Sequence, residues 1–382
     1  MDGKAFGRWE EGRTRPTFYA PLLCELYGKT AEELDLVEAA GTMKALKRPE
    51  FLDQARLRAV DSAADQLDMA RIAEVLHHSL AVDRRVLEDL VTMTQTYGRQ
   101  VHTFTPAGLL PFVRFHFADL MTLLTRSQPG SVQRQLELLA GETAVIAGYL
   151  SYRLHNYGDA ETYFGSTDLL AREAGDEPLR ALGLIARSAL YSPVPHGGVG
   201  GDPRTALALL DAAESAAGCE APPLHLTWLH ARRVEDYASC DQGDASDRSL
   251  EQAERTFSRV PARDQGFFHN WTPGRLIGYR GSAAVMLKRS SEAVAIVDTP
   301  LKQAPSVMAS ERSFLLIIQA AGYADQEQVE RSCALLSEAF VLARDAGLVE
   351  RIRRIKGTRR NHLDHWSLTA SVRQLDEQLL SV

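Results

Sequence analysis

The segment GYLSYRLHNYGDA, residues 148–160, begins and ends on small residues, Gly148 and Ala160, and carries a turn-forming run between them. The same interval of twelve residues recurs in two further pairs, Gly281 with Ala293 and Ala320 with Ser332. Two antiparallel helices joined by a short turn pack closely only where a residue on each helix lacks bulk. The interval therefore predicts helical hairpins that cross at these residues.

Large apolar residues follow the second small residue of each pair at helical spacing, and we expect them to fill the space beside the crossing: Phe164, Val297 and Leu336. The hairpin that opens near Thr272 is expected to be closed by Pro305, since proline ends helices. Two irregularities stand out. A Pro/Gly-rich loop at 191–201 interrupts the second unit, and Arg248 takes the small-residue place of the third, which is therefore expected to cross differently.

This pattern resembles the tetratricopeptide repeat (TPR), a helix-turn-helix unit of about 34 residues that stacks into a right-handed superhelix. The residues that match are Gly148, Ala160 and Phe164; Trp228 and Ala231; Gly281, Ala293, Val297 and Pro305; and Leu316, Ala320, Tyr323, Ser332, Leu336 and Ala339. About five units are expected. The predicted fold is therefore all-α, a TPR-like superhelical solenoid of helical hairpins with a partial N-terminal helix-turn-helix remnant.

The N-terminal segment, 1–36, carries the motif RWEEG at 8–12, a basic turn ending at Pro16, and LYGKTAEEL at 26–34. It resembles the C-terminal half of the Cro/C1-type (XRE family) helix-turn-helix DNA-binding domain. The first two helices of that domain have no counterpart here, so either the native start lies upstream of Met1 or the segment is a vestige. The resemblance makes Arg8, Arg13 and Arg15 candidates for DNA contact. Alternatively, these arginines form a solvated basic arm, or make phosphate contacts that do not depend on the DNA sequence.

The rest of the chain divides into four segments. Residues 37–81 are expected to form a linker and a helix, 82–130 the helices that lead into the repeats, 131–347 the TPR-like repeats, and 348–382 a basic segment with a capping helix. Asp83 and Thr105-Pro106 mark the starts of two strong helices. In the second of these, core and inter-helix packing is expected for four residues: Phe112, Phe115, His116 and Phe117.

Six positive charges lie within 351–360. They are expected either to face water, as the outer side of a terminal repeat does, or to contact a phosphate or an acidic partner.

Composition narrows the class of protein. The net charge of −7 argues against a protein that binds nucleic acid over its whole surface. The four cysteines lack CxxC spacing, which favours reduced thiols. Because we find no apolar run as long as a membrane span and no signal peptide, a cytoplasmic location and no membrane partner are expected. His77-His78 has no third ligand at metal spacing, so no metal and no cofactor are expected.

The concave surface of such a superhelix commonly receives a peptide. The candidates for this lining offer aromatic surface and hydrogen bonds: Tyr149, Tyr152, Arg153, Arg233, Asp236 and Tyr279. The predicted function is a transcriptional regulator in which the repeats sense a signalling peptide, small molecule or protein and control an N-terminal DNA-binding element, with a homodimer as the expected assembly. DNA is a partner if the helix-turn-helix is completed. The alternative is a TPR scaffold that holds partner proteins without binding DNA. No catalytic constellation is found, so an enzyme is not expected.

Overall fold

The computed structural model describes residues 71–72, 75–76, 82–101, 104–126, 128–192, 201–218, 221–261, 271–303 and 309–380. These all belong to one compact unit, 67–382, which is separate from a unit formed by 1–66. The segment that resembles a helix-turn-helix, with Arg8, Arg13 and Arg15, lies outside the described residues, and so do His77-His78 and Pro305.

The described part of the chain is all-α, and strands are absent from it. Among the described residues, α5 (Arg84–Gln100) and α6 (Pro106–Leu124) lead into the predicted repeats. The repeat region holds α7 (Gly130–Arg153), α8 (Tyr157–Ala174), α9 (Glu177–Ser188), α10 (Pro203–Ala217), α11 (Pro223–Ser239), α12 (Gly243–Phe257), α13 (Pro273–Met286), α14 (Ser290–Gln303), α15 (Ala309–Asp325) and α16 (Val329–Asp345). The chain continues through α17 (Val349–His362) and a short 3₁₀ turn, η2 (Asp364–Trp366), to α18 (Ala370–Leu379).

Side chains cap the helix starts that the sequence marked. The Asp83 carboxylate accepts hydrogen bonds from the backbone N–H groups of Arg85 and Val86, at 2.9 and 3.0 Å, at the start of α5. Thr105 accepts from Gly108 N at the start of α6, and Thr272 accepts from Arg275 N at the start of α13. These bonds satisfy donors that the first helical turn leaves unpaired. The predicted starts of these helices are confirmed.

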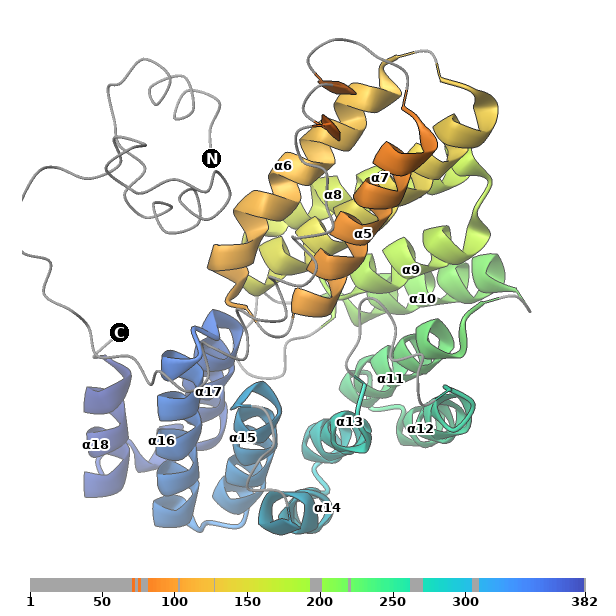
Figure 1. Ribbon diagram of the computed structural model, residues 1–382. Coiled ribbons are helices and arrows are strands. Elements are labelled where there is room, and N and C mark those ends of the chain that lie inside the picture. The colour runs from red at the N-terminus through yellow and green to blue at the C-terminus, as the bar shows by residue number, and fades with distance from the viewer. Residues whose placement is uncertain are drawn as a thin grey trace, which may run out of the picture. The chain divides into compact units, whose positions relative to one another are not determined.

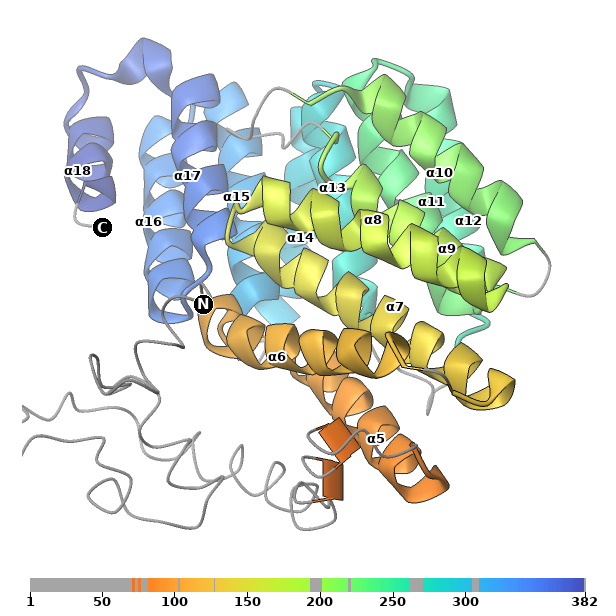
Figure 2. The ribbon, with the colours of Figure 1, turned by 90° about the horizontal axis from the view of Figure 1, so that it is seen from above.

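The helices pack in neighbouring pairs, as an all-α solenoid requires. Within the repeat region the pairs are α7–α8, α9–α10, α11–α12, α13–α14 and α15–α16. The first helix of each pair also packs on the first helix of the next, so that α7, α9, α11, α13, α15 and α17 form a continuous inner layer. Figure 1 shows α11, α13, α15 and α17 following one another in this order, and Figure 2 shows α7 and α8 running alongside each other.

Four of the pairs turn in the same way. The turn of each pair holds a non-glycine residue with positive φ, and that residue comes seven positions after the crossing residue of the first helix: His155 (φ 62°), Asp241 (59°), Lys288 (59°) and Glu327 (61°). The next residue donates its backbone N–H to a carbonyl of the first helix, as Gln328 N does to Tyr323 O at 2.9 Å. This left-handed turn with a hydrogen bond spanning six residues is a standard helix ending. The hairpins therefore share one backbone geometry.

The predicted crossings lie inside the protein. A Cβ added at Gly148 would lie 2.5 Å from the ring of Phe164, and one added at Gly281 would lie 3.1 Å from Val297. At the crossing of α15 and α16, the Ser332 hydroxyl donates to Ala320 O at 2.8 Å. Small residues thus permit the close approach that their spacing indicated.

The third pair differs from the prediction. Arg248 does not mark the crossing of α11 and α12; Ser246 does, and its hydroxyl donates to Val234 O at 2.8 Å. This bond is the counterpart of the one between Ser332 and Ala320, across the same interval of twelve residues. The interval of twelve residues therefore holds in this pair too, with a small residue on the second helix alone, and the placement of Arg248 at the crossing was wrong.

Helix α6 requires two further corrections. Its length and composition suffice to cross a membrane, contrary to the expectation that no apolar run is long enough. A core helix meets the same criterion, and α6 packs on α7 with Leu110, Val113 and Leu120 buried. His116 is buried as expected, but Phe115 is 46% exposed, so it is not part of the core.

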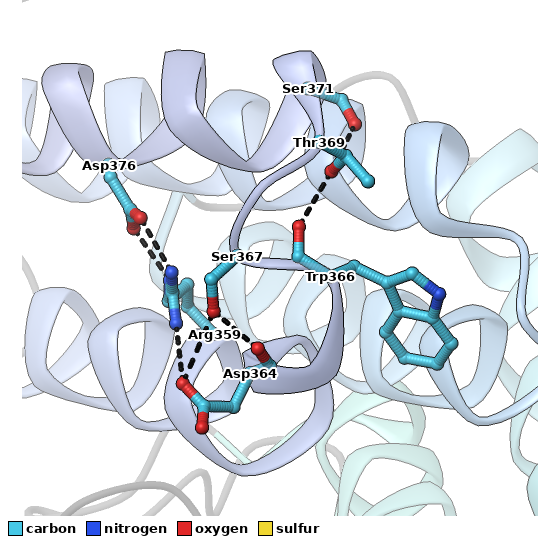
Figure 3. Close-up of polar contacts among 7 residues, drawn as sticks. All are labelled: Arg359, Asp364, Trp366, Ser367, Thr369, Ser371 and Asp376. Atoms are coloured by element: carbon cyan, nitrogen blue, oxygen red, sulfur yellow. Dashed lines mark hydrogen bonds and ion pairs between the residues drawn. The ribbon is translucent and has the colours of Figure 1, made fainter.

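The C-terminal helices are joined by an arginine fork. Arg359 on α17 donates to both carboxylate oxygens of Asp376 on α18, each at 2.6 Å, and to Asp364 at 3.2 Å (Figure 3). A bidentate pair fixes orientation as well as distance. This arginine of the basic run is therefore held by acidic groups of the chain itself.

Among the described cysteines, Cys240 and Cys333 are free thiols.

Candidate functional site

The inner layer encloses a cavity of about 110 Å³. Side chains of α7, α11, α13, α15 and α17 line it, so that helices from four pairs and the C-terminal segment meet at one place. Five of the lining residues are aromatic: Tyr149, Tyr152, Trp228, Tyr279 and Phe314. Five are arginines: Arg153, Arg232, Arg275, Arg351 and Arg354. Three are glutamates: Glu235, Glu311 and Glu350. The cavity therefore combines aromatic surface with an excess of positive charge.

Glu350 is the acidic centre of the α17 side of the cavity. Arg351 Nη1 donates to Glu350 Oε1 at 3.1 Å, and Arg354 Nε lies 3.4 Å from the same oxygen. Burial acts to raise the pKa of Glu350, but the charges of Arg351, Arg354 and Arg153 outweigh it and hold the pKa at about 2. The carboxylate is therefore charged at any physiological pH, and it partly offsets the arginines around it.

A second acid–base pair lies on α11. Arg232 Nη1 lies 3.5 Å from Glu235 Oε2, with both side chains almost fully buried, and Arg232 also donates to the Ser192 hydroxyl. Trp228, Arg232 and Glu235 follow one another at spacings of four and three residues, which places them on one face of the helix. This face is the one that α11 turns toward the cavity.

The aromatic rings hold the arginines in place. Arg351 and Arg354 both lie over the ring of Phe314, with guanidinium carbons 4.5 and 4.9 Å from its centroid. Arg275 lies 5.1 Å from the centroid of Trp271, which stacks on Tyr279 with an interplanar angle of 7°. A cation over an aromatic face is attracted by the ring quadrupole, more strongly where water is excluded. The guanidinium planes are therefore fixed by stacking as well as by ion pairs.

Some polar atoms of the site have no hydrogen-bond partner. Within the described part of the chain these include Nε and Nη1 of Arg354, Nε of Arg351 and Oε1 of Glu235. Buried polar atoms are normally paired, and each exception calls for an explanation. All four atoms belong to side chains that line the cavity.

Of the six predicted groove residues, the structure brings four together: Tyr149, Tyr152, Arg153 and Tyr279 line the cavity. The other two lie elsewhere. Arg233 points to the outer layer, where it donates to Asp211 at 2.5 Å and to Glu214 at 2.8 Å on α10. Asp236 is fully buried and is not among the residues that line the cavity. Ligand binding by these four lining residues stays a prediction.

Sequence reasoning missed the arginines of α17. Arg351 and Arg354 belong to the basic run, for which exposure to water was one of the two alternatives, yet both are shielded and paired with Glu350. Their spacing from Glu350, one and four residues, was a readable signal for a local charge cluster. Burial was not readable, because it depends on Phe314 and on helices distant in sequence.

Asp236 provides a pH-dependent prediction. Burial raises the pKa of Asp236 to about 6, although the charge of Arg232 and a hydrogen bond from Ser192 oppose the rise. A carboxyl group with a raised pKa favours the folded state most when protonated. Its contribution is complete below the ordinary pKa of 3.8 and is lost as the pH rises through 6.

We therefore compare the wild type with Asp236→Asn by chemical denaturation between pH 4 and pH 7. The free energy of unfolding of the wild type is expected to fall relative to that of the variant by about 2 kcal/mol over this range. Asp244→Asn, at an exposed position of α12, is the control for loss of one carboxylate. A constant difference between wild type and Asp236→Asn across the range contradicts the prediction.

The chain was also compared with known proteins. No model of a protein family matches the sequence, and a search of the curated proteins finds no match either.

Proposed function

We propose that the protein is a ligand-responsive regulator. In this proposal the repeats form a TPR-like superhelix that binds a ligand in the cavity of the inner layer, and the ligand controls a DNA-binding element within 1–36. One observation carries the proposal: side chains from α7, α11, α13, α15 and α17 converge on a single cavity with aromatic and arginine lining. A cavity assembled from helices of successive pairs changes shape when the pairs shift relative to one another, so a ligand that prefers one arrangement biases the whole solenoid.

The TPR-like part of the proposal is supported by the regularity of the hairpins. Four pairs share the same left-handed turn, and Ser246 and Ser332 make the same hydroxyl-to-carbonyl bond at their crossings. The alternation of an inner and an outer helix in every pair is what a stacked repeat produces.

The DNA-binding part is supported by the resemblance of 8–34 to the Cro/C1-type domain. Arg8, Arg13 and Arg15 are proposed to contact phosphates or bases there. A protein that neutralises phosphates with arginine releases counterions, so its affinity falls as salt rises.

The DNA-binding proposal is tested with the full chain by selection from a pool of random duplex DNA, followed by fluorescence anisotropy. We expect an enriched sequence whose affinity falls with salt. Replacing Arg8, Arg13 and Arg15 together by alanine is expected to make the slope of log K against log salt shallower by about three, close to one for each lost phosphate contact.

The control variant replaces three exposed basic residues outside the N-terminal segment by alanine, Arg85, Lys356 and Arg360, and is expected to keep the slope. If no sequence is enriched, or if both triple variants behave alike, the DNA-binding part is wrong. The alternative function is then a scaffold whose cavity and outer faces hold partner molecules.

A further inference from the structure

The cavity carries more positive charge than its own acids neutralise. Five arginines line it against three glutamates, and each glutamate is already engaged. Glu350 pairs with Arg351 and Arg354, Glu235 with Arg232, and Glu311 accepts from the Thr272 hydroxyl at 3.0 Å. Several arginine donors nevertheless have no hydrogen-bond partner in the described chain, and Glu235 Oε1 is the carboxylate oxygen among them that is also unpaired.

Arg354 is the arginine of the cavity with the most unpaired hydrogen-bond donors. The residue is 6% exposed, it lines the cavity, and its Nη1 has no hydrogen-bond partner in the described chain. Its Nε lies within ion-pair distance of Glu350 but is not hydrogen-bonded to it. A buried guanidinium presents a planar fork that matches the oxygens of a carboxylate or a phosphate. An acceptor placed in the cavity would complete this fork.

The surroundings of Arg354 define the rest of the ligand. The ring of Phe314 lies beneath Arg351 and Arg354, and Tyr149, Tyr152 and Tyr279 offer further aromatic surface. Pockets for drug-sized ligands start at roughly 300 Å³, whereas a cavity of roughly 150 Å³ takes a single benzene ring. The volume of about 110 Å³ is smaller than either, but the cavity is partly open to solvent, so it suits an oxyanion whose short apolar or aromatic body extends toward the opening.

We propose that this cavity binds a small organic anion, with Arg354 and Arg351 holding its carboxylate or phosphate group and Phe314 packing against its body. This inference rests on the proposed function, since it names the ligand class of the same cavity.

The test is isothermal titration calorimetry on the full chain in the absence of DNA. The probes are benzoate, phenyl phosphate, acetate, inorganic phosphate and the neutral benzamide. We expect one of the two aromatic anions to bind, more tightly than the matching acetate or inorganic phosphate, and benzamide not to bind. Preference for benzoate assigns a carboxylate ligand, and preference for phenyl phosphate assigns a phosphate ligand.

The variant Arg354→Gln is expected to weaken the binding of the preferred anion about 10- to 100-fold, as loss of a hydrogen bond to a charged group does. Arg360→Gln makes the same charge change at an exposed position of the same helix and is expected to leave binding unchanged. If Arg354→Gln does not fold, as judged by circular dichroism, Arg354→Lys keeps the charge but loses the fork and is expected to weaken binding at least about tenfold.

The proposal is overturned if neither aromatic anion binds, if benzamide binds as tightly as the preferred aromatic anion, or if a folded Arg354 variant binds like the wild type. The comparison of the preferred aromatic anion with benzamide uses the unaltered chain, so it decides the proposal even when no Arg354 variant folds. Because DNA is absent, anion binding without DNA recognition refutes only the DNA-binding part of the proposed function. DNA recognition without anion binding refutes only the ligand class.

Discussion

Glu350→Gln is expected to lower the free energy of unfolding by about 3 kcal/mol at pH 7. The side chain of Glu350 is 17% exposed and lies against Arg351 and Arg354, and its amide replacement leaves two shielded guanidinium groups without their counter-charge. Removing one partner of a buried ion pair costs far more than the pair itself contributes, because the remaining charge stays out of water. The measurement is denaturant unfolding followed by far-ultraviolet circular dichroism.

The pH dependence of this difference provides an independent check. The pKa of Glu350 is lowered to about 2 in the folded state, so its contribution is present above its ordinary value of 4.5 and is lost as the pH falls toward 2. The difference between wild type and Glu350→Gln is therefore expected to be constant from pH 7 to pH 5 and to shrink below pH 4.5.

Glu330 supplies a matched control for this substitution. It follows the first residue of α16, a valine, just as Glu350 follows the first residue of α17, so both carboxylates meet the same helix dipole. Glu330 is exposed, and Glu330→Gln is expected to cost less than about 1 kcal/mol. Equal losses at the two positions would show that the dipole, and not the arginine cluster, accounts for the role of Glu350.

The hairpins could be predicted from the sequence because a close crossing depends on side-chain bulk, which is a local property. Gly148 with Ala160 and Ala320 with Ser332 were found in this way. The crossing of the third pair was not predicted, because its first helix has Val234 there and only Ser246 on the second helix is small. The serine hydroxyl is satisfied by the valine carbonyl, so one small residue suffices there. A rule that demands two small residues misses such a crossing.

The cavity could be predicted only in part, for a geometrical reason. Neighbouring residues on a helix point about 100° apart, so of the adjacent Arg232 and Arg233 only one faces the inner side. The sequence alone does not show which of the two faces inward. Arg233 was predicted to line the cavity, but it pairs with Asp211 and Glu214 on the outer layer. The charge of Glu235, which acts on Arg354, also lies far earlier in the chain.

Gly148→Val is expected to lower the free energy of unfolding by about 3 kcal/mol, because it inserts atoms into a closed helix crossing. An added Cβ alone would lie 2.5 Å from Cε1 of Phe164, a ring that is 1% exposed and has no free space to enter. Even Gly148→Ala is expected to destabilise, although alanine favours a helix over glycine by about 1 kcal/mol. Urea unfolding of the variants measures both losses.

The control is Gly165→Ala on α8, the helix that Gly148 faces, where an added Cβ meets no atom within 4 Å. There the helix propensity acts alone, and a gain of about 0.5 to 1 kcal/mol is expected. Pairing Gly148→Ala with Phe164→Leu is expected to recover about 1 kcal/mol relative to the sum of the two single losses, since the smaller side chain makes room for the methyl group. If the two losses add without coupling, Gly148 does not contact Phe164, and α7 and α8 do not cross at this residue. If the coupling is present, the twelve-residue interval reports a physical crossing, on which the position of Tyr149, Tyr152 and Arg153 at the cavity depends.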